Sequence, residues 1–106
     1  HVEASDEAGH EGDVKLKIRT IEDLDSRVLK IIYETLQTWS EPVAIALLPD
    51  HPTPCAIRTH TNKPIPFVIY KPGQTPDSVT RYDEFAAKEG KYGVLEKDQF
   101  IREFLR

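Results

Sequence analysis

The sequence predicts an α/β fold in which a mostly parallel sheet is flanked by helices. Three observations predict this class. Apolar residues recur at helical spacing between residues 14 and 39, a continuous apolar run follows at 43–48, and a second run stands at 65–70. With a short strand expected at residues 1–5 and a helix at the other end, the expected order is β-α-β-loop-β-α.

The first helix is the most strongly predicted element. Residues 1–5 are expected to form a strand, and the acidic, glycine-containing stretch after them to form a loop. Asp13 then suits the N-cap position, because its carboxylate can accept a backbone N–H of the first turn. The helix should bury one apolar face and end near Ser40, since the residue before Pro42 disfavours helical backbone.

The strands follow from two apolar runs. The run 43–48 is apolar throughout, which is typical of a central strand buried on both faces. Residues 52–64 read as a loop rich in proline and threonine, and Pro66 confines the strand 65–70 to a sheet edge or a strand start. Apolar residues near the C-terminus predict a terminal helix: Leu95, Phe100, Ile101, Phe104 and Leu105.

The composition indicates one globular domain, residues 1–106, and excludes several functions. Apolar residues make up 39% and charged residues 30%, which is a globular balance. The net charge of −4 argues against nucleic acid as a partner. No apolar run suits a membrane span, and the single Cys55 cannot form an internal disulfide, so we expect a soluble, cytoplasmic protein. The absence of an initiator methionine leads us to expect part of a longer chain.

Five side chains are candidate metal ligands. Asp6 and His10 are four residues apart, which places both on one face of a helical turn. Asp50 and His51 are adjacent at a strand end, where open α/β sheets put their sites, and His60 lies in a polar loop. Carboxylates and imidazoles suit Zn²⁺, Mn²⁺ or Co²⁺. Taken singly, each motif is more often structural: an acidic loop facing solvent, a turn cap or a surface histidine.

Three segments carry these residues in a fixed order: 2–13 (VEASDEAGHEGD), 47–54 (LLPDHPTP) and 58–67 (RTHTNKPIPF). Together they closely resemble the signatures of the archaeal-type, 2,3-bisphosphoglycerate-independent phosphoglycerate mutases, over essentially all 106 residues. The resemblance implies that residues 1–106 are a C-terminal fragment, the metal-binding part of an alkaline-phosphatase-like three-layer sandwich. It also implies a metal-dependent isomerase of glycolysis and gluconeogenesis that interconverts 3-phosphoglycerate and 2-phosphoglycerate through a phosphoenzyme.

The resemblance also implies roles for the five candidates. One ion would be held by Asp6, His10 and His60, and a second ion by Asp50 and His51. The two divalent cations would be Mn²⁺, Zn²⁺, Co²⁺ or Mg²⁺. The nucleophilic serine or threonine and a further aspartate would lie outside this chain, which therefore holds no catalytic nucleophile and no substrate-binding residue that can be matched.

Two alternatives remain open at this point. The chain could belong to another phosphotransferase of the same superfamily, such as a homoserine kinase-like enzyme, because the metal motifs do not fix the substrate. It could also be a non-catalytic module stabilised by metal. A separate expectation concerns the fragment itself. Because two ligands of the second ion are missing, we expect the isolated chain to be inactive and to bind at most one metal weakly, and its unpaired sheet edges favour self-association.

Overall fold

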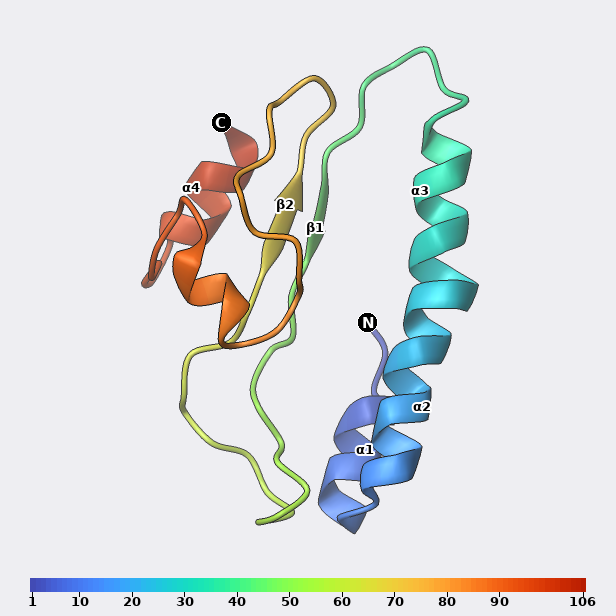
Figure 1. The fold of residues 1–106 in the computed structure, drawn as a ribbon, viewed down its shortest axis with the longest axis vertical. Coiled ribbons are helices and arrows are strands. Elements are labelled where there is room, and N and C mark those ends of the chain that lie inside the picture. Colours follow the sequence, from blue (N-terminus) through green and yellow to red (C-terminus); the bar gives the residue numbers. More distant parts are fainter. The chain divides into compact units, whose positions relative to one another are not determined.

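A computed structural model describes residues 1–106, which group into two compact units. Unit 1 consists of His1–Glu41 and His51–Lys63, and unit 2 of Pro42–Asp50 and Pro64–Arg106. Figure 1 shows the elements in chain order. They are α1 (Ala4–Glu11), α2 (Val14–Leu24), a π-helical turn (Asp25–Leu29), α3 (Lys30–Leu36), β1 (Ile45–Leu47), β2 (Val68–Tyr70), a 3-10 turn (Ala86–Glu89) and α4 (Gln99–Leu105).

Helix α1 occupies the segment for which a strand and a loop were predicted, so that prediction is wrong. A strand at residues 1–5 would need a neighbouring strand for its backbone, whereas a helix satisfies its hydrogen bonds internally. Asp6 and Glu7 lie in the first turn, where carboxylates favour the positive end of the helix dipole. Gly12 ends the helix in the left-handed conformation with φ 70°, and its N–H bonds to the carbonyl oxygens of Ala8 and Gly9.

The long helix is confirmed, with its predicted cap. The N–H of Leu16 donates to Asp13 Oδ1 over 2.9 Å. In Figure 1, α2, the π-helical turn and α3 form one continuous rod, with α1 beside α2. None of the helices combines the length and apolar character that crossing a bilayer requires.

The apolar stripe of this helix is exposed, which contradicts the predicted burial of one face. Ala8, on α1, is the buried apolar residue of unit 1, with 1% of its surface exposed. Helix α1 packs against α2 but leaves much of the stripe uncovered. Leu24, Leu29 and Leu36 of the stripe are half-buried. Its other members are between 41% and 57% exposed: Val14, Ile18, Ile21, Val28, Ile31, Ile32 and Trp39.

Unit 2 contains a two-stranded antiparallel sheet in which Ala46 of β1 lies opposite Ile69 of β2. The predicted mostly parallel sheet is therefore wrong, and β1 is half-buried and paired along one edge only. The cause lies in the connection 48–67, which contains no helix. Parallel neighbours need a crossover, usually helical, and a proline-rich loop simply brings the chain back in the opposite direction.

The terminal helix is confirmed as α4, and aromatic side chains attach it to the rest of unit 2. The Phe67 and Phe100 rings meet edge to face with their centroids 5.2 Å apart. The ring centroids of Tyr92 and Phe67 are 5.8 Å apart, and those of Phe104 and Phe100 are 6.4 Å apart. This aromatic cluster joins the segment before β2, the segment after the 3-10 turn, and α4.

Candidate metal centre

Three of the five predicted ligands converge in unit 1. Asp6 and His10 project from α1 at i and i+4, as their spacing predicts, and His60 comes from the loop 51–63. The carboxylate lies 3.3 Å from His10 Nε2 and 3.2 Å from His60 Nε2, and the two imidazole nitrogens are 3.0 Å apart. We call these three residues the triad.

These separations fit a divalent first-row ion. A tetrahedral ion with bonds of about 2.05 Å separates its ligand atoms by about 3.3 Å. The Asp6 carboxylate lies at similar distances from the two imidazoles, but through different oxygens, Oδ2 for His10 and Oδ1 for His60. One carboxylate oxygen and one nitrogen of each imidazole could therefore hold one ion, since these ligand atoms all lie within 4.8 Å of one another. The triad side chains are between 35% and 48% exposed, so further coordination positions face solvent. Three protein ligands with an open position are typical of catalytic rather than structural zinc sites.

Thr53 fixes the orientation of the Asp6 carboxylate. Its hydroxyl donates to Asp6 Oδ1 over 2.6 Å, and the residue is 4% exposed. This bond is the main reason why the pKa of Asp6 lies below its usual value; burial opposes it, and the nearby histidines lower the pKa further. Lys17 on α2 donates to the Thr53 carbonyl oxygen over 2.6 Å. The loop that carries His60 is thereby tied to both α1 and α2.

Arg58 fixes the tautomer of His10. Its carbonyl oxygen lies 3.0 Å from His10 Nδ1, and since a carbonyl only accepts, Nδ1 must donate. A neutral His10 then carries its lone pair on Nε2, the atom that faces the triad. Arg58 has a left-handed backbone with φ 55°, which is uncommon for a residue with a side chain and often accompanies functional sites.

The other two predicted ligands, Asp50 and His51, belong to different units. His51 belongs to unit 1, and its ring lies 3.6 Å from the His60 ring, centroid to centroid. Its Nδ1 lies 3.2 Å from the hydroxyl oxygen of Thr53. Asp50 closes the first segment of unit 2 and is exposed. A ligand role for Asp50 and His51 stays a prediction.

Two contributors were not found by sequence reasoning. Thr53 stands between two prolines, three residues after Asp50. A polar side chain so close to a candidate ligand is the sequence feature that could have indicated its role. Arg58 acts through its backbone carbonyl, for which the sequence holds no signal. Gly9 permits the arrangement, because a Cβ there would collide with the Thr53 carbonyl oxygen and lie 2.9 Å from its methyl group.

Comparisons with known proteins relate this chain to a family. The profile of the Metalloenzyme superfamily matches residues 1–99. The 2,3-bisphosphoglycerate-independent phosphoglycerate mutase of Methanothrix thermoacetophila is 49% identical over 102 residues, which cover 96% of this chain and 26% of the relative. The enzyme of the same name from Methanosarcina barkeri is 45% identical over 102 residues, covering 95% of this chain and 26% of the relative.

A solved structure is also similar to this chain. The PH0037 protein from Pyrococcus horikoshii matches with a TM-score of 0.69 and 36% sequence identity, over 84% of this chain and 26% of that one. The chain thus spans about a quarter of the length of these relatives. It belongs to the metalloenzyme superfamily, and it is homologous to one part of the archaeal-type 2,3-bisphosphoglycerate-independent phosphoglycerate mutases.

Proposed function

We propose that this chain supplies a metal centre of a cofactor-independent phosphoglycerate mutase, with Asp6, His10 and His60 as ligands of one divalent cation. The observation that carries the proposal is the convergence of one carboxylate and two imidazoles at separations of 3.0–3.3 Å. Relatives that bear the name of this mutase match 95–96% of the chain. Mn²⁺, Zn²⁺, Co²⁺ and Mg²⁺ are the candidate ions, and the donor set favours the first three.

The chemistry requires positive charge next to a phosphoryl group. Bound divalent cations offset the spread negative charge of a transferred phosphoryl group and lower the pKa of a hydroxyl nucleophile. The chain's own residues hold the ligands in place. Thr53 orients the carboxylate of Asp6, and the bond from His10 Nδ1 to the Arg58 carbonyl turns His10 Nε2 towards His60 Nε2, 3.0 Å away. Because these partners hold the donors before an ion arrives, little reorganisation is needed on binding.

The proposal extends to the complete enzyme. Asp50 and His51 would contribute to a second ion, and residues 1–106 would form the metal-binding part of a phosphatase-like domain. The nucleophilic serine or threonine and a further aspartate ligand would come from the rest of the polypeptide. The substrate would be phosphoglycerate, and the place of action would be glycolysis and gluconeogenesis in the cytoplasm.

The test is an assay of the complete protein that contains this chain, in both directions between the phosphoglycerates. His10→Ala should lower kcat at least about 100-fold, because removing a ligand should cost more than the 10–100-fold of changes around the ligands. His1→Ala is the matched control, since His1 is exposed and pairs only with Glu3. Full activity of His10→Ala would remove this residue from the centre. An inactive wild-type protein with full metal loading would refute the mutase assignment.

A further inference from the structure

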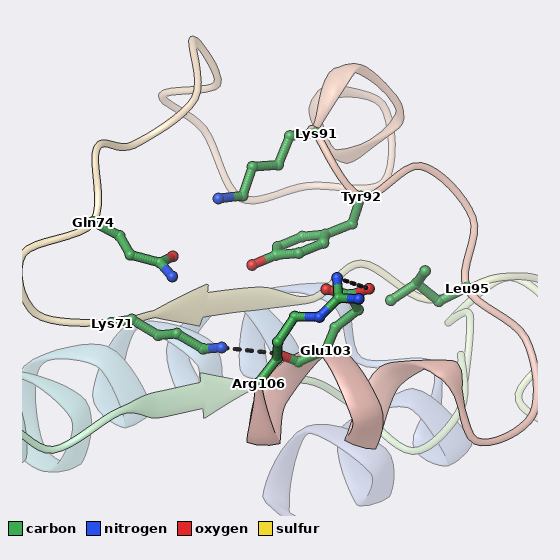
Figure 2. A pocket seen from close by; sticks show the side chains of 7 residues that line it. All are labelled: Lys71, Gln74, Lys91, Tyr92, Leu95, Glu103 and Arg106. Carbon is green, nitrogen blue, oxygen red and sulfur yellow. Dashed lines mark hydrogen bonds and ion pairs between the residues drawn. The ribbon is translucent and has the colours of Figure 1, made fainter.

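Unit 2 contains a cavity that the proposed metal centre does not use. Its volume is about 450 Å³, within the range of small-molecule sites. The lining comes from three segments: the end of β2 with the turn after it, the segment after the 3-10 turn, and α4. In Figure 2 the ends of Lys71, Gln74, Lys91 and Tyr92 point into one shared space above α4.

The cavity is rich in hydrogen-bond donors and positive charge. Three cationic side chains line it, those of Lys71, Lys91 and Arg106, against the single carboxylate of Glu103. The whole chain has a net charge of −4, so this concentration of cations is a local departure from its overall charge. A small anion would be repelled by most of the chain and attracted here.

The acceptors of Glu103 are already engaged. The Glu103 carboxylate lies 3.4 Å from Arg106 Nη1, and the Glu103 carbonyl accepts from the Lys71 ammonium over 2.8 Å. Lys71 keeps two further protons, and the Lys91 ammonium lies 5.1 Å from the centroid of the Tyr92 ring. Asp77 is close to Lys91, but its two oxygens accept the backbone N–H groups of Lys91 and Val79.

We propose that this cavity binds a small phosphorylated anion, held by the ammonium groups of Lys71 and Lys91 with the amide of Gln74 and the hydroxyl of Tyr92 as further donors. A phosphate group carries three terminal oxygens, which can accept from several donors at once. Tyr92 belongs to both the lining and the aromatic cluster, and its ring lies 5.8 Å from the Phe67 ring, centroid to centroid. The site contains none of the proposed metal ligands, so a failure of this proposal and a failure of the proposed mutase function can be distinguished.

The test titrates inorganic phosphate into the 106-residue chain, followed by amide NMR shifts in the presence of a chelator. Saturable shifts are expected at Lys71, Gln74, Lys91 and Tyr92. Lys91→Gln should weaken binding about tenfold, which is typical for loss of one charge-assisted hydrogen bond. Lys30→Gln, an exposed position in unit 1, makes the same charge change and should leave the affinity within twofold.

A second variant and a second anion complete the design. Tyr92→Phe keeps the ring in the aromatic cluster but removes the hydroxyl, and it should weaken phosphate binding without unfolding unit 2. Acetate at the same ionic strength should bind more weakly than phosphate. The proposal would be overturned by shifts that do not saturate, by equal losses in Lys91→Gln and Lys30→Gln, or by acetate binding as well as phosphate.

Discussion

Replacing Thr53 with valine tests how the candidate centre is held together. Valine has nearly the shape of threonine, so the packing of Thr53 against Gly9 should persist while the hydroxyl is lost. That hydroxyl donates to Asp6 Oδ1 over 2.6 Å, a length typical of strong bonds to a charged oxygen. Since Thr53 is only 4% exposed, water cannot readily replace the missing donor.

The expected magnitude follows from these contacts. Groups that orient a metal ligand typically change metal affinity by about 10–100-fold when they are removed. We expect Thr53→Val to weaken Zn²⁺ or Mn²⁺ binding by at least about tenfold, and Thr53→Ser to restore most of the affinity. The pKa of Asp6 would rise towards its usual value of 3.8, so the carboxylate would remain ionised at neutral pH. The ratio of the metal dissociation constants of the variant and the wild type should therefore stay constant from pH 7 to pH 8.5.

The assay is competition between the 106-residue chain and a metal-binding indicator. The matched control is Thr38→Val, whose hydroxyl donates to the Thr35 carbonyl over 2.7 Å at an exposed position outside the triad. Circular dichroism should show the same helix content in all variants. The reasoning is refuted if Thr53→Val binds metal within twofold of wild type, or if Thr53→Ser binds as weakly as Thr53→Val.

Three further predictions concern the loop contact, pH and metal removal. Gly9→Ala should displace the loop 51–63 from α1, because the added Cβ would collide with the Thr53 carbonyl oxygen. The rate of amide hydrogen exchange in this loop should therefore rise, and an unchanged rate would contradict the prediction. Backbone N–H groups of Lys91 and Val79 hold the pKa of Asp77 below its usual 3.8. This stabilisation is present above about pH 4 and is lost as pH falls through the lowered pKa. In urea unfolding, Asp77→Asn should therefore cost more stability at pH 7 than at pH 3, and an equal cost at both would contradict the assignment. Metal at a concentration 100 times its dissociation constant should raise the free energy of unfolding by about 2.7 kcal/mol, and a chelator should remove this gain. A thermal unfolding midpoint that changes with neither metal nor chelator would argue against metal binding to the native state.

The elements that the sequence predicted well are those with local signals. Asp13 caps the long helix as expected, and the spacing of Asp6 and His10 places both on one face of a helical turn. The residues 1–5 were misassigned because a short segment fits either state. Glycine at position 12 is a residue that often ends helices. Only the structure shows that Gly12 takes the left-handed conformation and ends α1.

The errors in the sheet have a different origin. An apolar run such as 43–48 indicates burial, but it says nothing about the direction of the neighbouring strand. That direction was decided by the connection, which lacks a crossover helix. The long-range contacts of the triad were likewise beyond local patterns, since His60 lies 50 residues from His10 and is held through Thr53 and Lys17.

The exposed apolar stripe bears on the predicted self-association. Val14, Ile18, Ile21 and Ile31 are each more than half exposed on one helix, and β1 pairs along one edge only. Exposed apolar surface and open strand edges both favour association between chains. We therefore expect the isolated chain to self-associate with rising concentration, which sedimentation velocity would detect; a monomer at every concentration would contradict this.

The most direct test of the metal centre is a crystal structure of the zinc-loaded chain with anomalous diffraction at the zinc edge. The account predicts one strong peak within about 2.0–2.2 Å of the Asp6 carboxylate, His10 Nε2 and His60 Nε2, with Thr53 still bonded to the carboxylate. A peak elsewhere, with these three side chains turned away from one another, would contradict it.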